Sequence, residues 1–462
     1  MTGRQRLIGR SLLALAAALA TVSGAAAATP RPGSLDKRFG DDGTLTGQIG
    51  CVPLSVAGIE RQFGGGFRVI GSTERSSPEL PGESGRLVVR GYDRRGHLDR
   101  DVGGTGTVIV PLPNGRPARA LGVTRQRDGK LVVVGSVGDG STQDLFVARF
   151  YPDGSLDAAF GSAGVVTTDL AALAGEAGQE VAVQPDGRLV VAATGQYTYP
   201  SFQGSFSTEL VVLRYEPDGR LDAGFASGGM LHLVSASFGA YFGVGGLGLA
   251  RDGTIFVGGE AGITHRDGNT ATIARIHADG SLDRMVYLPG AFDSVRAMSF
   301  DRTRGRIYLA GSTSRPRFAA KQAMQVAAVR EDDLALDKRF GAQGFAQADF
   351  PKTDYDFASA VISDRRGRVV LAGAAGTNQQ AAGPVRAPRS RFAVARFTTA
   401  GKLDRRFGRR GIARVGFPYA QSIAFDVLEQ PVGRLVLAGI GARTEFQPSS
   451  GCALAVARLA AR

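Results

Sequence analysis

A nine-residue motif that recurs along the chain constrains its fold more than any other feature. The clearest copy is Leu156-Asp157-Ala158-Ala159-Phe160-Gly161-Ser162-Ala163-Gly164. All seven copies have aspartate at the second position, and these residues are Asp36, Asp99, Asp157, Asp222, Asp283, Asp337 and Asp404. The copies that begin at Leu98 and Leu282 lack the phenylalanine that the other five carry at the fifth position. Successive aspartates are 63, 58, 65, 61, 54 and 67 residues apart, so the chain consists of repeats about sixty residues long.

Each repeat carries four short β-strand patterns. The first two are joined by a turn of the Asp-Gly type, such as Asp186-Gly187, where glycine adopts positive φ without steric cost. The second pattern (189–193 in the same repeat) and the third (145–150 in the preceding one) are almost continuously apolar, as in strands that are buried on both faces. The nine-residue motif and a short fourth strand follow. The 66 glycines suit short strands joined by many turns, and four strands per repeat predict one blade of a β-propeller.

The two ends of the chain distinguish a closed ring from an open solenoid. The mature chain is expected to enter at the first motif copy and to stop in a third-strand pattern that ends at Leu459. Arg149 precedes Asp157 by eight residues, and the same offset from Arg458 places the next aspartate at position 466, one normal repeat after Asp404. We therefore predict an all-β, seven-bladed propeller of four-stranded antiparallel blades, in which the N- and C-terminal strands share one blade. Closure removes open sheet edges, whereas a solenoid would need polar caps.

The first 28 residues differ from the rest. Arg4, Arg6 and Arg10 precede an apolar run (12–22) and an alanine run that ends at Ala28. This pattern is typical of a secretory signal peptide with cleavage near Ala28, and the apolar run is short for its alternative, a membrane anchor. We expect residues 1–28 to be a signal peptide and residues 29–462 to be the propeller of a secreted or periplasmic protein, with no transmembrane segment.

The chain has two cysteines, Cys51 and Cys452. Cys51 closes the first fourth strand and Cys452 opens the last third strand, so antiparallel pairing across the junction would bring the two sulfurs together. In an exported protein this predicts a disulfide. An entropic model of loop closure predicts that it stabilises the fold by about 5 kcal/mol. Two unpaired buried thiols are the alternative.

These features resemble the delta-60 repeat family, whose members are bacterial and usually exported. The resemblance rests on the Leu-Asp-x-x-Phe-Gly-x-x-Gly motif and on second strands such as Asp128-Gly129-Lys130-Leu131-Val132-Val133-Val134-Gly135, and it covers essentially the mature chain. It implies a propeller-like repeat domain, and it implies no catalytic residue.

The residues that recur in every repeat are best explained by structure. A phenylalanine that returns once per blade is expected to be a packing plug. The motif aspartates are expected to accept hydrogen bonds from their own turns and to pair with third-strand arginines. A periodic calcium site is the alternative, but one carboxylate per turn is a poor set of oxygen ligands. We expect no metal and no cofactor.

Function is expected where the repeats differ. The variable segments lie mostly between second and third strands, at 72–85, 196–208, 312–323 and 374–390, which is the pattern of a binding face on a rigid scaffold. Two of these segments are cationic and a third is aromatic. The candidate binding residues are Arg315, Arg317, Lys321, Arg386, Arg389, Tyr197 and Tyr199.

We therefore expect a monomeric binding or interaction module that recognises an anionic envelope polymer or a protein partner. The formal charge of +13 agrees with an acidic ligand, although such a surplus often serves only solubility, and nucleic acid is not expected for an exported chain. The four histidines lie in different repeats and form no recognisable catalytic motif. The alternative is a hydrolase or lyase centred on the channel, with Asp293, Asp356 and Glu180 as acid/base candidates. A structural or adhesive role is a third possibility.

Overall fold

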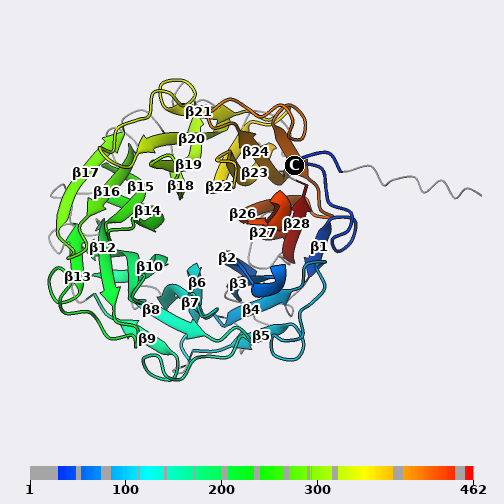
Figure 1. Cartoon of the computed structure of the whole chain (residues 1–462). Coiled ribbons are helices and arrows are strands. Elements are labelled where there is room, and N and C mark those ends of the chain that lie inside the picture. The colour runs from blue at the N-terminus through cyan, green and yellow to red at the C-terminus, as the bar shows by residue number, and fades with distance from the viewer. Residues whose placement is uncertain are drawn as a thin grey trace, which may run out of the picture.

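A computed structural model describes residues 30–47, 54–73, 85–112, 115–139, 143–170, 173–198, 206–233, 240–263, 270–288, 292, 294–314, 321–377, 389–442 and 453–460. In these segments the strands form seven antiparallel sheets of four, arranged around a ring (Figure 1). The helical elements among them are the short 3-10 turns η1 (Phe63–Gly65) and η3 (Pro431–Gly433). No helix in these segments is long and apolar enough to cross a membrane. The predicted fold class is confirmed.

The sheets are numbered here as blades 1 to 7, starting from the sheet that contains β2. The first, innermost strands are β2 (Leu54–Arg61), β6 (Ala118–Arg125), β10 (Ala174–Val183), β14 (Ala240–Leu249), β18 (Ser294–Asp301), β22 (Tyr355–Ser363) and β26 (Gln421–Gln430). The second strands are β3 (Phe67–Thr73), β7 (Leu131–Val137), β11 (Leu189–Thr198), β15 (Ile255–Ile263), β19 (Arg306–Ser314), β23 (Val369–Thr377) and β27 (Arg434–Ala442). The third strands are β4 (Leu87–Tyr92), β8 (Asp144–Phe150), β12 (Phe206–Tyr215), β16 (Thr270–Ile276), β20 (Gln322–Arg330), β24 (Arg389–Phe397) and β28 (Ala453–Leu459). The fourth strands are β5 (Thr107–Val110), β9 (Val165–Thr168), β13 (Met230–Leu233), β17 (Leu282–Leu288), β21 (Phe345–Ala348), β25 (Ile412–Val415) and, in blade 7, β1 (Thr44–Gly47).

Blade 7 joins the two ends of the chain. β1 pairs antiparallel with β28, with Thr44 opposite Ala457 and Gly47 opposite Leu454 (Figure 1). The shared blade that the repeat arithmetic predicts is therefore confirmed. Cys51 and Cys452 lie outside the described residues, as does the expected signal peptide, so the disulfide and the cleavage stay predictions.

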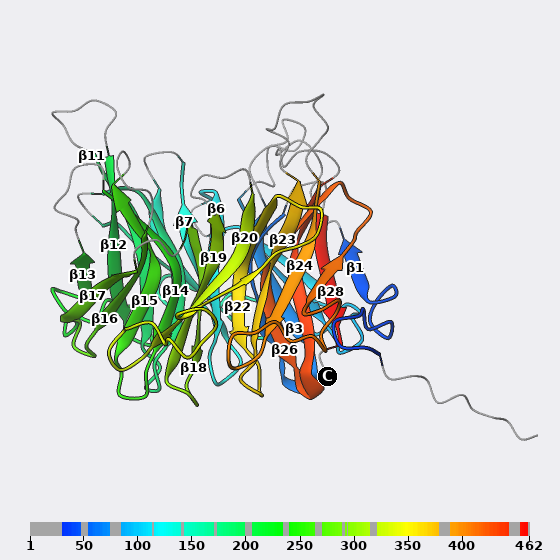
Figure 2. The same ribbon diagram turned by 90° about the horizontal axis from the view of Figure 1, so that it is seen from above.

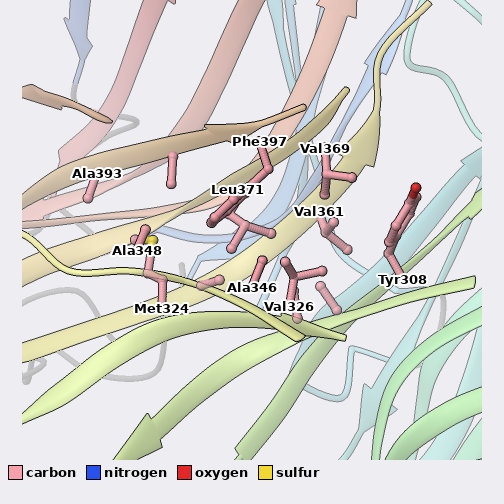
Figure 3. Close-up of a cluster of buried hydrophobic side chains, with 14 of the residues drawn as sticks. Tyr308, Met324, Val326, Ala346, Ala348, Val361, Val369, Leu371, Ala393 and Phe397 are labelled. Atoms are coloured by element: carbon pink, nitrogen blue, oxygen red, sulfur yellow. The ribbon is translucent and has the colours of Figure 1, made fainter. Parts of the chain in front are cut away.

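The hydrophobic core lies between blades rather than within one. In the cluster of Figure 3, Tyr308 and Val326 of blade 5 pack with Val361 and Leu371 of blade 6. Each sheet is covered on both faces by its neighbours, which explains why second strands such as β7 are continuously apolar.

The nine-residue motif fastens each blade to the next one. In blade 2 the Phe160 ring is fully buried under the Arg149 guanidinium, whose central carbon lies 4.6 Å from the ring centroid. Arg149 also donates to Asp157 over 2.7 Å and to the carbonyl of Pro217, in blade 3, over 2.5 Å. We call this arrangement of arginine, aspartate and phenylalanine the signature clasp.

A backbone hydrogen bond accompanies the clasp. The Gly161 N–H donates to the Asp218 carbonyl of blade 3 over 2.8 Å. Gly219, two positions before the next motif, lies against the plug, since a Cβ there would come within 3.0 Å of the Phe160 ring. At its φ of +97° glycine is also the residue with the least backbone strain. The motif thus contacts the Asp218-Gly219 turn, which lies between the third strand and the motif of the following blade.

Every motif aspartate pairs with an arginine in the described structure. The pairs are Arg458–Asp36, Arg68–Asp99, Arg149–Asp157, Arg214–Asp222, Arg275–Asp283, Arg306–Asp337 and Arg396–Asp404. In six of the seven motifs the aspartate also accepts a hydrogen bond from the backbone N–H two residues further on, as expected. The pair between Arg458 and Asp36 joins residues that are 422 positions apart.

The arginine does not always come from the third strand, as the sequence pattern suggested. Blade 1 has Gly91 at the expected place, and Arg68 of the second strand occupies the space, because a Cβ on Gly91 would lie 2.8 Å from the Arg68 Nη1 atom. In blade 5 the structural counterpart is Ala328, whose carbonyl accepts a hydrogen bond from the Asp337 N–H as that of Arg149 does from the Asp157 N–H, and Arg306 of β19 supplies the charge. The ion pair is thus present in every blade, although the strand that supplies the arginine differs.

Removal of one plug tests the clasp. Replacement of Phe160 by alanine should lower the free energy of unfolding by about 3–5 kcal/mol, because it leaves a cavity between two blades. Chemical denaturation measures the loss. The matched control is Phe63→Ala, which removes a ring that is 69% exposed and should change stability little. Equal effects of the two substitutions would contradict the plug.

Candidate functional site

A pocket of about 520 Å³ opens beside β24 and β25 of blade 6. It lies toward the face where second strands connect to third strands, since residues at the end of β23 and the start of β24 line it. These ends of β23 and β24 lie toward the top of Figure 2. Its lining residues are Lys352, Thr353, Ala375, Gly376, Thr377, Arg389, Ser390, Arg391, Arg414, Phe417, Pro418, Tyr419 and Ala420. We call it the cationic pocket.

The charged residues that line this pocket are all basic. Lys352, Arg389, Arg391 and Arg414 are all exposed, and no carboxylate is among the lining residues. Within the described segments none of the four forms an ion pair, although Arg414 donates to the Pro351 carbonyl over 3.2 Å. Four cations that have no carboxylate partner in the described part of the chain favour an anionic ligand.

Backbone and hydroxyl contacts hold the pocket walls in place. Ser390 lies between the two arginines of β24, and its N–H donates to the Ala420 carbonyl over 3.3 Å. The Ser422 N–H donates back to the Ser390 hydroxyl over 3.2 Å, which ties β24 to the first strand of blade 7. Phe417 packs edge-on against the buried Phe392, with ring centroids 4.8 Å apart. The aromatic and cationic groups are therefore presented on strands and short connections.

Of the predicted binding residues that the structure describes, only Arg389 lines this pocket. Lys321 lies at the start of β20, where its Nζ is 2.7 Å from Asp349, so its charge is already paired. Tyr197 belongs to β11 of blade 3, away from blade 6. Arg315, Arg317, Arg386 and Tyr199 lie outside the described residues.

Sequence reasoning missed Lys352, Arg414 and Tyr419. Lys352 and Tyr419 lie in the connections that enter and leave blade 6, which the repeat analysis did not treat as variable. Arg414 belongs to β25, which pairs with β24 and places Arg414 opposite Ala393, two residues after Arg391. Pairing of the fourth strand with the third would have revealed this neighbour, whereas the two connections give no such signal.

A second group of titratable residues lies on innermost strands, toward the centre of the ring. All seven first strands have a β-bulge at the same place, and Glu180 and Asp426 each follow that bulge directly. Asp426 accepts hydrogen bonds from the N–H of Val427 over 2.6 Å and of Ile59, in blade 1, over 2.8 Å. Gly58 permits this approach, because a Cβ there would lie 3.2 Å from the carboxylate.

The protein environment makes these carboxyl groups hard to ionise. Burial raises the pKa of Asp426 to about 6, although two backbone hydrogen bonds act in the opposite direction. Burial, and then repulsion from Asp426, raise the pKa of Glu180 to about 8 and that of Glu60 to about 7. Glu180 is therefore mainly protonated at neutral pH, which is a state that a general acid needs.

The three catalytic candidates of the sequence analysis do not lie together in the described structure. Glu180 lies at the centre of the ring, in the group just described. Asp356 is buried near the start of β22 and accepts hydrogen bonds from the Phe350 N–H and the Thr353 hydroxyl, both over 3.0 Å, so it caps a connection between blades. Burial raises the pKa of Asp356 to about 6. Asp293 lies outside the described residues. Within the described residues, no three histidine, cysteine or acidic side chains are placed to hold a metal ion.

Comparison with known proteins identifies the type of repeat. A family model described as a domain of unknown function (DUF5122), β-propeller, matches residues 126–160, 184–225 and 250–284. Each match begins in or near the turn before a second strand and ends in a nine-residue motif. The chain is a β-propeller repeat protein. No curated protein matches it.

Solved structures give only distant likenesses. A catalytically inactive virginiamycin B lyase from Staphylococcus aureus, bound to quinupristin, has a TM-score of 0.47 at 10% identity, over 90% of this chain and 98% of the lyase. A polysaccharide lyase has a TM-score of 0.45 at 10% identity, over 90% and 91% of the two chains. A gluconolactonase from Xanthomonas campestris has a TM-score of 0.36 at 14% identity, over 90% and 97%. We draw no functional argument from likenesses this distant.

The raised pKa of Glu180 predicts a pH dependence of stability. The pKa is higher in the folded protein (about 8) than the ordinary 4.5, so the stability linked to this proton is complete below pH 4.5 and is lost as the pH rises through 8. Relative to the wild type, Glu180→Gln should gain at least about 1 kcal/mol between pH 5 and pH 9. Thermal unfolding across that range measures the gain. Asp101→Asn, on an exposed turn, is the control, and a gain no larger than that of the control would contradict the assignment.

Proposed function

We propose that this propeller is an exported binding module that holds an anionic polymer of the cell envelope on its variable face, in the cationic pocket. The observation that carries the proposal is the set of four exposed cations, with no carboxylate partner among the described residues, arranged around about 520 Å³ of space. The proposed export rests on the signal-peptide pattern of residues 1–28.

A carboxylate-bearing polysaccharide fits this chemistry best. Arg389 and Arg391 can each donate two parallel hydrogen bonds to a carboxylate, and Lys352 adds a charge on a more flexible side chain. Tyr419 and Phe417 line the same pocket and offer ring faces and edges to the C–H surface of a sugar. The pocket volume falls in the range of ordinary small-ligand sites, so it would hold a short stretch of a polymer.

Binding to an acidic polysaccharide tests the proposal. Polygalacturonate should bind in low salt and neutral dextran should not, as measured by isothermal titration calorimetry. The double variant Arg389→Glu, Arg391→Glu should weaken binding at least tenfold, because it replaces two attractions by two repulsions. Added salt should weaken the binding of the wild type as well.

The control variant reverses the charge of one arginine on the other side of the ring. Arg127 is an exposed residue in the turn between β6 and β7, so Arg127→Glu should leave the affinity unchanged. Equal losses in the double variant and the control would show a general charge effect. Undiminished binding in the double variant would remove the cationic pocket from the proposal.

Acid/base catalysis is a second candidate, favoured by the protonated Glu180 and its neighbour Asp426 on the innermost strands. In this case an acidic polysaccharide would be shortened, which size-exclusion chromatography detects. Glu180→Gln would abolish the shortening if the carboxyl group acts as the acid. A polymer that stays intact with the wild type would leave the protein as a binding module.

A further inference from the structure

The motif copy of blade 6 carries more arginine than any other copy. It reads Leu-Asp-Arg-Arg-Phe-Gly-Arg-Arg-Gly (403–411), so arginine fills all four variable positions, whereas no other copy has more than two basic residues there. Together with Arg414 of β25, residues 405–416 contain five arginines and no acidic residue. The counterpart segment of blade 2, 158–169, has no arginine and still forms the clasp. The fold therefore does not require these five arginines.

Backbone hydrogen bonds hold this motif copy in place. The Arg409 N–H donates to the Ile412 carbonyl over 2.7 Å, which closes the turn that leads into β25. The Gly408 N–H donates to the Pro32 carbonyl over 2.7 Å, which fixes the motif to the chain segment before β1. The arginines are thus presented from an ordered backbone, so a ligand that binds them pays little for ordering the chain.

A cavity of about 720 Å³ opens at this motif. Lys402, Arg405, Arg406 and Arg410 line it, and all four are exposed. Within the described residues none of the four forms an ion pair. Asp404 also lines the cavity, but its carboxylate is already paired with Arg396 at 2.9 Å. In the part of the chain that the structure describes, the charge without a partner around this cavity is positive.

Strand β25 connects this cavity with the cationic pocket. Arg410, two residues before β25, lines the cavity, and Arg414, within β25, lines the pocket. Four residues of extended chain span at most roughly 13 Å. Beyond β25 the Arg391 guanidinium lies beside Gly416, since a Cβ there would come within 3.5 Å of its Nη1 atom. Because β25 is the outermost strand of its sheet, both groups of cations lie along one edge of blade 6.

We propose that this edge of blade 6 binds an extended polyanion with a carboxylate on successive sugars. One stretch of the polymer occupies the cationic pocket, and another lies against Lys402, Arg405, Arg406 and Arg410, which we call the arginine turn. This inference rests on the proposed function and adds to it a preference for long chains. Two regions that hold the same polymer bind it more tightly than either alone, because the second contact forms within the complex.

Chain length is the variable that tests the arginine turn. A trisaccharide and a dodecasaccharide of galacturonic acid are titrated separately into the full-length protein in low salt, by isothermal titration calorimetry. The dodecasaccharide contains ten overlapping trisaccharides, so one binding region alone would give it about a tenfold advantage in affinity by statistics. With two regions, we expect the advantage to be at least a hundredfold.

The triple variant Arg405→Ala, Arg406→Ala, Arg410→Gln removes the arginine turn and changes no residue that lines the cationic pocket. Each new residue already stands at the same motif position in another blade. These counterparts are Ala158, Ala159 and Gln343. Gln343 even shares the positive φ of Arg410, at +55° against +57°, so the fold accommodates the change. The advantage of the dodecasaccharide should fall to about tenfold, whereas the affinity for the trisaccharide should change less than twofold.

The control is a second triple variant with the same loss of charge. Arg100→Ala, Arg127→Ala, Arg251→Ala removes three exposed arginines from blades 1, 2 and 4. It should keep the full advantage of the dodecasaccharide. A loss as large as that of the first triple variant would show an effect of net charge and would overturn the arginine turn.

The remaining outcomes separate this inference from the proposed function. If the wild type prefers the dodecasaccharide only about tenfold, or if the first triple variant keeps the full advantage, the arginine turn is overturned and the cationic pocket stands. Self-association of that variant in sedimentation, with undiminished binding, would show that the arginines protect an open strand edge instead. Absence of binding by both oligosaccharides to the wild type would overturn both proposals.

Discussion

The contact between a buried arginine, the motif aspartate and the plug of the same blade is the interaction on which this ring depends. It joins three elements: the sheet of one blade, the motif turn of the same blade, and the turn of the next blade that precedes the next motif. In blade 2 the guanidinium of Arg149 satisfies Asp157 and a carbonyl of blade 3 while it covers the Phe160 ring. A buried aspartate without such a partner would be costly, so the pair and the fold require each other.

This requirement explains why every repeat combines the motif aspartate with an arginine. In blade 1 the third strand has Gly91 in place of the arginine, and Arg68 of the second strand fills the same space. Blade 5 makes the same exchange with Arg306. The physical requirement is a cation at one point in space, and the strand that supplies it can change.

The sequence alone was sufficient to predict the blade count and the shared blade, because both follow from the spacing of one motif. It also indicated Glu180, and it placed Arg389 on a binding face. It could not reveal that Lys352 and Arg414 lie beside Arg389, since these residues come from three chain segments that meet only in the folded sheet.

Departure from the repeat marks the cationic pocket. Blade 6 adds cations to the strands and connections at one end of its sheet. The clasp contacts recur from blade to blade and supply the scaffold. A repeat protein can therefore acquire a site without a change of fold.

The most direct test of this account is a double-mutant cycle on Arg458 and Asp36, the clasp that joins the two ends of the chain. The single variants Arg458→Ala and Asp36→Ala and the double variant are compared by chemical denaturation. If the ring is closed by the clasp, the coupling energy should be at least about 1 kcal/mol and similar to that of Arg149 and Asp157. A coupling energy near zero for Arg458 and Asp36, beside a clear coupling for Arg149 and Asp157, would contradict closure of the ring by this contact.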